Sequence, residues 1–440
     1  MSRILLAGGR VIDPASGRDE AADVLVDGGL IAAVGPGRSV SGGAGTGSPE
    51  QTIDCAGLLV APGFIDLHVH LREPPAPHED SPDLAETLAT GAAAAAAGGF
   101  TTVCAMPNTQ PPLDSPEAVA GYIEQARRAG RSRVLVVGCL TAGRAGRRPA
   151  DLAAMVKAGA VAFSDDGADV ADPVVFGHAL REAARLGAPV LCHCEDPALA
   201  AGGVMNDGPL ATALGLPGLS RDAEDVAVGR ACDAAARTGC RVHICHVSTE
   251  GAVEIVRRAK AAGAPVTAEA APYHLALVDE RLFSRDAVYK VNPPLRTGHD
   301  VDAVLAGVAD GTIDCLATDH APHTAAAKAR RLAEAPSGMI GLESALPVYI
   351  QTLLSTRRIT WPQLVARLTV NPARVLSARS GTLAVGAAAD VTVIDPNAAW
   401  TIDPARFASR ARNCPFAGWN VRGRAMLTMV GGRIVYRLNA

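Results

Sequence analysis

Between residues 58 and 355, short apolar runs rich in β-branched residues alternate with longer alanine-rich stretches. Such runs are typical of buried strands, and the alanine-rich stretches are typical of helices that cover them. The alternation predicts eight strands, at Leu59–Leu67, Phe100–Ala105, Val134–Leu140, Ala160–Ser164, Pro189–His193, Val242–His246, Val266–Ala270 and Ile313–Thr318.

A glycine closes most of the predicted helices shortly before the next strand begins. These are Gly98, Gly130, Gly159, Gly187, Gly239, Gly263 and Gly311. Glycine is favoured there because it adopts the left-handed conformation that caps a helix at its carboxyl end. Eight such β/α units predict a closed parallel (β/α)8 barrel of the TIM type, with an open doubly wound sheet as the alternative fold.

The two chain ends have a different pattern. Short strand-like pieces surround Gly-Gly and Asp-Gly-Gly turns in residues 3–34, and similar pieces recur near the carboxyl end. We therefore expect residues 1–57 and 376–440 to form one small β-sandwich-like domain beside a barrel of residues 58–375. Residues 36–50 are rich in Gly and Ser, which predicts a mobile surface connection.

Composition narrows the class of protein. A chain of 440 residues has room for a large barrel and a small satellite domain, and with only 3% aromatic residues its core must consist of small aliphatic side chains. The net charge of −4 provides no basic surface for nucleic acid or anionic lipid. Neither a signal peptide nor a membrane span is recognisable, so we expect a cytoplasmic protein whose ten cysteines are reduced.

Cys192 and Cys194 flank His193 and could suggest a thiolate metal site. No second cysteine pair has zinc-finger spacing anywhere in the sequence, so packing is the favoured interpretation of both residues.

The strongest chemical signal is a pair of histidines, His68 and His70, at the end of the first predicted strand. Residues two apart in a strand point to the same side, and two imidazoles on one side can chelate one metal ion. Barrel active sites form at the carboxyl ends of the strands, where this pair is expected to lie.

Other ligand-type residues follow later strands: Asp165 and Asp166, His193, His246 and Asp319. Each alone could be a capping aspartate or a buried histidine bound to backbone. Their joint position at strand ends instead predicts a metal centre.

Two further histidines lie close to this set in the sequence. His243 has the opposite strand parity to His246, so we expect it to face the helices in a structural role. His274 follows strand seven and either lines the pocket or does not; the pattern leaves this open.

A set of motifs extends over nearly the whole chain: GFIDLHVHLREP, AGGFTTVCAMPNTQP, AGAVAFSDDG, HCED, VHICHVS, YKVNPPLR, IDCLATDHAPH, APSGMIGLE, ADVTVIDP and NCPFAGW. Through these motifs the chain resembles the type I dihydroorotases of the amidohydrolase superfamily. The resemblance implies reversible cyclisation of N-carbamoyl-L-aspartate to dihydroorotate, the third step of de novo pyrimidine biosynthesis.

The resemblance also implies roles for individual residues. His68, His70 and Asp319 would hold one zinc ion, His193 and His246 a second, and Asp166 would bridge them. One or two zinc ions are compatible with this ligand set. Substrate contacts are implied for His70, Arg72, Asn108, Asn292, His323 and the backbone at Ser337 and Gly338.

The chemistry of these side chains agrees with the implied roles. Zinc bound by imidazole and carboxylate lowers the pKa of a water toward roughly 7. Asp319 is suited to move the proton as the catalytic base in one direction and the acid in the other. Arg72 has the planar donor fork that matches a substrate carboxylate, and Asn108 can add hydrogen bonds.

The sequence departs from the resemblance at two places. The segment after Pro74 is several residues longer than usual, so the loop over the site is expected to differ. Tyr273 stands where many relatives carry a histidine.

Two other functions compete with this interpretation. Hydantoinases, dihydropyrimidinases and allantoinases commonly bridge two metals with a carboxylated lysine after strand four, and none of the four lysines here lies at that place. A non-catalytic scaffold for aspartate transcarbamoylase would typically lack metal ligands, which are all retained here. We expect an active homo-oligomer, and the sequence leaves open whether it also binds that partner.

Overall fold

The computed structural model describes residues 3–37, 48–73, 85–200 and 202–438. Residues 38–47 of the predicted mobile connection, and residues 74–84 of the lengthened segment, lie outside the described residues. All ten cysteines of the sequence are described, and each is free and buried. None of the described helices combines the length and apolar character that a membrane crossing requires.

Eight parallel strands in the described residues form the barrel, in the spatial order β15-β14-β13-β10-β9-β8-β7-β6. Their bounds are β6 (Phe64–Val69), β7 (Phe100–Ala105), β8 (Arg133–Cys139), β9 (Ala160–Ser164), β10 (Val190–Cys192), β13 (Val242–Ile244), β14 (Val266–Ala270) and β15 (Cys315–Leu316). The sheet closes where the amide of His70 donates to the carbonyl of His320 at 2.8 Å and Val69 pairs with His320. The predicted barrel is therefore confirmed, and the open sheet is excluded.

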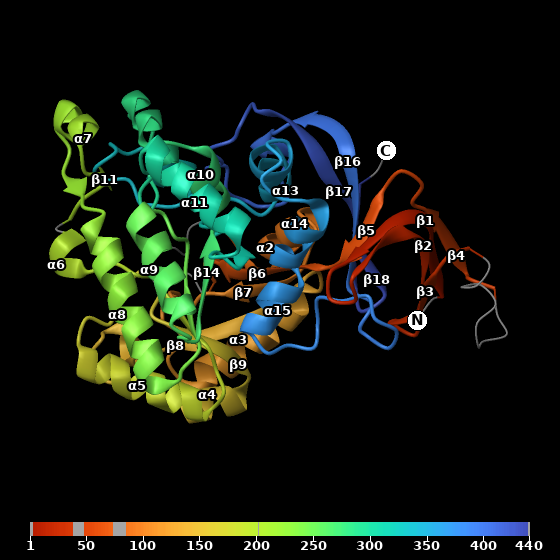
Figure 1. Ribbon diagram of the computed structural model, residues 1–440, viewed down its shortest axis with the longest axis horizontal. Coiled ribbons are helices and arrows are strands. Elements are labelled where there is room, and N and C mark those ends of the chain that lie inside the picture. Colours follow the sequence, from red (N-terminus) through yellow and green to blue (C-terminus); the bar gives the residue numbers. More distant parts are fainter. Residues whose placement is uncertain (1–2, 38–47, 74–84, 201, 439–440) are drawn as a thin grey trace.

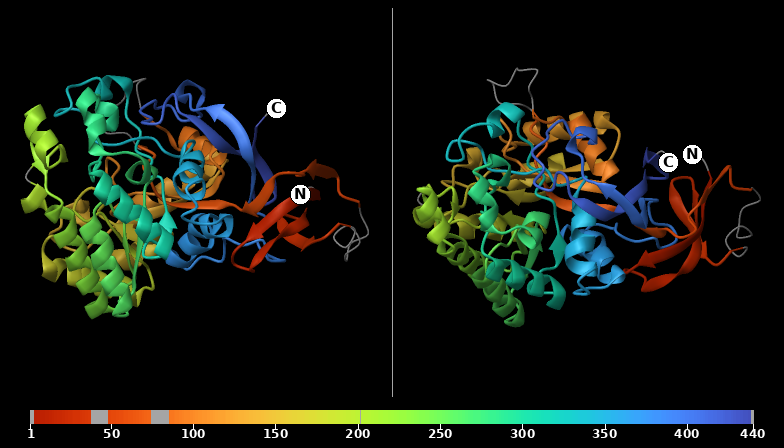
Figure 2. Two further views of the ribbon diagram at one scale, coloured as in Figure 1. Left: turned by 45° about the horizontal axis from the view of Figure 1, so that its top comes forward. Right: turned by 90° about the horizontal axis from the view of Figure 1, so that it is seen from above.

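Helices surround the barrel in Figures 1 and 2. The longer ones are α2 (Leu88–Ala97), α3 (Pro116–Ala129), α4 (Leu152–Ala158), α5 (Pro173–Arg185), α8 (Asp222–Thr238), α9 (Glu250–Ala261), α11 (Gly298–Asp310) and α14 (Trp361–Leu368). Shorter ones are α6 (Pro197–Ala200), α7 (Pro209–Leu214), α10 (Pro272–Ala276), α12 (Ala325–Lys328), α13 (Ala345–Tyr349) and α15 (Val370–Val375). A two-stranded pair, β11 (Met205–Asn206) and β12 (Gly218–Leu219), adjoins α7.

The predicted glycine caps are left-handed at six of the seven positions, with Gly98 as the exception. Gly98 has a φ of −81°, and the next residue, Gly99, takes the left-handed conformation at 93°. A Cβ at Gly98 would lie 2.0 Å from the carbonyl oxygen of Leu342. Glycine is required there by this close approach and not by the backbone angle.

The core has two layers that follow strand parity. Side chains such as Leu67, Met106, Val137 and Cys245 form an apolar cluster inside the barrel. Neighbours of opposite parity pack against the helices, and Ile244 belongs to this larger outer cluster. This alternation decides which strand residues can reach the centre of the barrel.

Both chain ends join one further sheet, as predicted, in the order β18-β17-β16-β5-β1-β2-β3 with β4 paired to β1. Its strands are β1 (Ile4–Asp13), β2 (Arg18–Asp27), β3 (Leu30–Gly35), β4 (Gln51–Asp54), β5 (Leu59–Pro62), β16 (Val391–Thr401), β17 (Asn420–Val430) and β18 (Arg433–Arg437). Red and blue strands lie side by side there in Figure 1, at one side of the barrel.

The expectation of one continuous strand from Leu59 to Leu67 is wrong. The segment divides at Gly63 into β5, which pairs with β16 in the end-formed sheet, and β6, the first barrel strand. A Cβ at Gly63 would come within 2.2 Å of Thr101, so only glycine allows the chain to pass between the two sheets. The division of domains at residues 57/58 and 375/376 remains our prediction.

Candidate metal centre and substrate pocket

His68 and His70 lie at the carboxyl end of β6 and point to the same side, with ring centroids 5.3 Å apart. Both are buried. Two-residue strand periodicity thus places their rings beside each other, as the sequence predicts.

His246 and Asp319 follow β13 and β15 and have positive φ values of 35° and 43°. Residues other than glycine seldom adopt this region, and such strain clusters at functional sites. The left-handed turn directs both side chains toward His68, whose ring centroid lies 5.0 Å from that of His246.

The same turn makes the expected orientation of His243 wrong. Its Nε2 lies 3.0 Å from Oε2 of Glu269 in the barrel interior, and not against the helices. Strand parity holds between His243 and Cys245, but it fails at His246 because the chain has left the β conformation.

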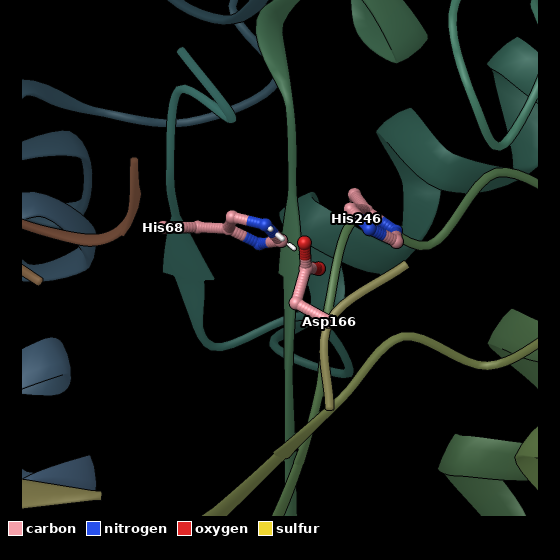
Figure 3. Close-up of side chains that lie close together, drawn as sticks. All are labelled: His68, Asp166 and His246. Carbon is pink, nitrogen blue, oxygen red and sulfur yellow. Dashed lines mark ion pairs between the residues drawn. The ribbon is translucent and has the colours of Figure 1, made fainter. Parts of the chain in front are cut away.

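Asp166 lies between His68 and His246 in Figure 3, with Oδ1 3.2 Å from Nε2 of His68. Its Oδ2 accepts a hydrogen bond of 2.9 Å from Nδ2 of Asn108. Asp165 is turned to the loop after β8, where its Oδ1 accepts from the amides of Leu140 and Thr141 at 2.9 and 3.0 Å. Of the two aspartates, Asp166 is therefore the one in the histidine cluster.

Asp319 and His193 complete the cluster. Oδ1 of Asp319 lies 3.0 Å from Nε2 of His70 and 3.5 Å from Nε2 of His68. Nδ1 of His193 lies 3.0 Å from Nε2 of His246. The structure thus brings together all six residues predicted as metal ligands.

Two groups of these residues have ligand atoms close enough for one ion. They are His68, His70 and Asp319, and His68, Asp166 and His246, each with its atoms within 4.8 Å of one another. Within the described residues, Nε2 of His68, Oδ1 of Asp166 and Nδ1 of His246 are buried without a hydrogen-bond partner. Buried polar atoms without partners are costly, so this donor set fits a metal ion, and imidazole with carboxylate suits zinc.

The pKa values of the residues at this centre also agree with a bound metal ion. Burial would raise the pKa of Asp319, but His68 and His70 hold it well below its ordinary value. Burial opposes a charge on His68, yet Asp319 and Asp166 raise its pKa well above the ordinary value. Burial would likewise raise the pKa of Asp166, but His68 and His70 hold it well below its ordinary value, so both buried carboxylates favour a cation beside them.

His68 also forms a third group with Cys245 and Glu269. Burial and the nearby Glu269 raise the pKa of the Cys245 thiol to about 12, so the thiol keeps its proton at neutral pH. A protonated thiol is a poor zinc ligand. The pKa values of Cys192 and Cys194 are raised well above the ordinary value, primarily by burial, which agrees with packing.

A pocket of about 260 Å³ opens over the centre. Its walls contain the predicted residues His70, Arg72, Asn108, Asp166, His193, His246, Asn292, Asp319, His323, Ser337 and Gly338, together with Gly167, Val291 and Ala321. His274 does not line it, since its Nε2 lies 3.1 Å from the carbonyl of Pro293 in a buried position.

One wall of this pocket combines Arg72 with His323. Nε of Arg72 donates to the carbonyl of Pro322 at 3.1 Å, and its NH2 lies 3.5 Å from Nε2 of His323. Nε2 of His323 lies 2.7 Å from the carbonyl of Ser337. Burial and the adjacent Arg72 lower the pKa of His323 to about 3, so its ring is neutral.

Two of the residues predicted to contact substrate also make hydrogen bonds within the protein. The amide of Gly338 donates to the carbonyl of Lys290 at 2.9 Å. Oδ1 of Asn108 lies 2.9 Å from Nδ1 of His70, so Asn108 joins His70 to Asp166 while it also lines the pocket.

Two residues of the site were not predicted from the sequence. The hydroxyl of Tyr273 donates to Oδ2 of Asp319, and Oε1 of Glu269 lies 2.9 Å from Nδ1 of His68. A glutamate inside the apolar strand VTAEA was the available signal for Glu269, because charges are seldom buried in a barrel without a partner.

The chain is similar to known enzymes over nearly its whole length. Residues 57–252 match the family model described as dihydro-orotase-like. A dihydroorotase of Pelotomaculum thermopropionicum is 47% identical over 98% of both chains, and one of Geobacter metallireducens is 44% identical over 99% of both. The L-hydantoinase (dihydropyrimidinase) of Arthrobacter aurescens has a TM-score of 0.85 at 26% identity, covering 99% of this chain and 96% of its own.

The closed barrel and its cluster of histidines and carboxylates define an enzyme of the amidohydrolase type. Full-length identity of this degree is decisive for the family. The chain belongs to the dihydroorotase family.

Proposed function

We propose that the protein is a zinc-dependent dihydroorotase that interconverts N-carbamoyl-L-aspartate and (S)-dihydroorotate with release or uptake of water. The observation that carries this proposal is a single pocket. It joins the histidine and carboxylate cluster to Arg72 and His323, so metal-type ligands and a carboxylate-binding cation share one cavity.

The six clustered residues would hold the zinc: His68, His70, Asp166, His193, His246 and Asp319. Zinc bound there supplies polarisation of the amide carbonyl and a water that is acidic enough to react near neutral pH. The ligand set fits one or two ions.

Asp319 is the proposed proton carrier. Its Oδ1 faces His70 at 3.0 Å and its Oδ2 accepts from Tyr273, so the carboxylate is held in one orientation at the pocket wall. In ring opening it would take a proton from the attacking water and pass it to the departing ring nitrogen. In ring closure it would take a proton from the ureido nitrogen and pass it to the oxygen that leaves as water. The low pKa of its carboxyl, described above, keeps it ionised before ring closure.

Arg72 would bind the α-carboxylate of the substrate, since a guanidinium makes paired, planar contacts with a carboxylate. Asn108, Asn292, His323 and the backbone at Ser337 and Gly338 line the same pocket and would orient the ring. Dihydroorotate carries this carboxylate, whereas hydantoin and dihydrouracil do not.

The decisive experiment compares kcat/KM for dihydroorotate, hydantoin and dihydrouracil on protein of measured zinc content. We expect a preference of about 100-fold or more for dihydroorotate, because the other rings lack the carboxylate that matches the partly buried cation of Arg72. Comparable values for hydantoin would contradict the assignment. Bound zinc without any turnover would favour the scaffold function.

The cellular setting follows from the same proposal. The reaction belongs to the third step of de novo pyrimidine biosynthesis, and the ten free, buried cysteines support a reducing, cytoplasmic compartment. Assembly into a homo-oligomer, and binding to aspartate transcarbamoylase, stay predictions that light scattering with and without that enzyme would test.

A further inference from the structure

A buried carboxylate lies below the metal centre, inside the barrel. Glu269 lies in β14, one residue before the strand ends, and none of its surface is exposed. Its Oε1 lies 2.9 Å from Nδ1 of His68, and its Oε2 lies 3.0 Å from Nε2 of His243. Both rings are fully buried as well, so Glu269 connects two histidines from different strands.

This contact determines which nitrogen of His68 is free for the centre. A carboxylate only accepts hydrogen bonds, so Nδ1 of His68 must carry the hydrogen that points to Glu269. A metal-bound ring is neutral, so Nε2 would then carry the lone pair for the metal on the side that faces Asp166 at 3.2 Å and Asp319 at 3.5 Å. The other tautomer would direct a lone pair at the carboxylate of Glu269, which is repulsive.

His243 holds Glu269 from the opposite side. Its Nδ1 lies 2.8 Å from the hydroxyl of Thr267, which can donate to that nitrogen and leave the hydrogen on Nε2. Nε2 then donates to Glu269. Thr267 thus donates to His243, and His243 and His68 both donate to Glu269. The two rings and the carboxylate are fully buried, where such bonds are strong, whereas Thr267 is partly buried.

We propose that Glu269, held by His243, is a positioning residue that fixes His68 as an Nε2 ligand of the metal. The inference rests on the proposed function, because it assigns His68 to that metal. Carboxylates that accept from a ligating histidine fix its tautomer and ring orientation, and their loss lowers metal affinity by about 10- to 100-fold.

The test measures zinc affinity by competition with a chromophoric chelator in the full-length protein, without substrate. Glu269→Gln is the first variant, since glutamine has the same shape but opposes one ring with an amide NH2. We expect its zinc affinity to fall about 10- to 100-fold, while the zinc-free protein keeps a cooperative melting transition.

A matched control separates positioning from simple loss of a buried carboxylate. Glu86 lies 3.3 Å from Nε2 of His320 and is also fully buried, but His320 is not a proposed ligand. Glu86→Gln should lower the melting temperature of the zinc-free protein and leave zinc affinity within about twofold of wild type, as expected for loss of a buried pair.

Two substitutions of His243 test the chain without altering Glu269. His243→Gln keeps a donor toward Glu269 and should retain most of the zinc affinity, whereas His243→Leu removes the donor and should weaken zinc several-fold. These two His243 variants also test the positioning role of Glu269 if Glu269→Gln does not fold.

The outcomes separate the two proposals. Wild-type protein that binds no zinc would overturn the proposed function. Wild-type protein that binds zinc, with Glu269→Gln and both His243 variants equal to it in affinity, would refute the positioning role alone and leave these residues purely structural.

Discussion

The phenol of Tyr273 donates a hydrogen bond to Oδ2 of Asp319, and both side chains are buried. The other oxygen, Oδ1, faces Nε2 of His70 at 3.0 Å. The two oxygens of Asp319 therefore have different surroundings. Oδ1 is directed to the proposed metal ligands, and Oδ2 is held by the uncharged hydroxyl of Tyr273.

Tyr273→Phe should lower kcat for dihydroorotate by about tenfold, because a hydrogen bond to a charged group contributes about 1.5–3 kcal/mol and here fixes the proton carrier. Zinc content should not change. Steady-state kinetics and metal analysis check both expectations.

Tyr349→Phe is the matched control for this variant. Its buried hydroxyl donates to the carbonyl of Ala317 at 2.9 Å and not to Asp319. It should change thermal stability and leave kcat nearly unaltered. Equal kcat values for Tyr273→Phe and wild type would mean that the phenol only fills space.

Asp319→Asn should keep most of the zinc and lose about 10²- to 10⁴-fold in rate, since an amide can still ligate weakly but cannot take up a proton. Single-turnover rates and zinc content measured on the same preparation distinguish the two effects. An active Asp319→Asn enzyme would exclude Asp319 as the proton carrier.

Asp166→Ala should instead lower zinc content, particularly at the side of His193 and His246. Asp166 lies between His68 and His246 in Figure 3, and Oδ1 has no hydrogen-bond partner among the described residues. Asp165→Ala is the control, because that carboxylate accepts from the amides of Leu140 and Thr141. Full zinc content and a normal rate in Asp166→Ala would refute a bridging role.

The features that could be predicted from the sequence are those that depend on local periodicity. The shared face of His68 and His70 follows from the two-residue repeat of a strand, and the barrel follows from eight regular β/α units. The position of His246 and Asp319 beside them follows from the rule that barrel sites form at strand ends.

Contacts between distant parts of the chain could not be predicted in this way. Glu269 reaches His68 across 201 positions of the sequence, and no local pattern encodes that pairing. The orientation of His243 was mispredicted because parity was counted through His246, whose left-handed φ of 35° reverses the alternation. The apolar character of Leu59–Leu67 likewise predicted one strand, whereas the chain passes from one sheet to another at Gly63.

Arg72→Lys should reduce kcat/KM for dihydroorotate by about 10- to 100-fold despite the same charge. The planar fork of Arg72 is held by the carbonyl of Pro322 at 3.1 Å, and an ammonium cannot make a paired contact with a carboxylate. Arg128→Lys is the control, since that exposed arginine pairs with Glu124 on α3. If both variants have wild-type kinetics, Arg72 does not bind the substrate carboxylate.

The last prediction concerns Lys328, whose Nζ donates to the carbonyls of Lys290 and Pro336 at 3.2 and 3.0 Å beside the pocket wall. Burial and the neighbouring Lys290 lower the pKa of Lys328 from 10.5 to about 7. Between these two values the unfolded chain keeps the proton and the folded chain loses it. Folding stability contributed by this group therefore rises with pH in that window, because the unfolded state binds more protons.

The melting temperature of wild type relative to Lys328→Met should accordingly increase as the pH is raised from about 7 to about 10. Lys157→Met, at an exposed position on α4, is the control for replacing a lysine by methionine. Scanning calorimetry of the three proteins across this range gives the measurement. A difference for Lys328→Met that stays constant with pH would show that Lys328 remains protonated in the folded protein, and that its ammonium holds the Pro336 segment at every pH tested.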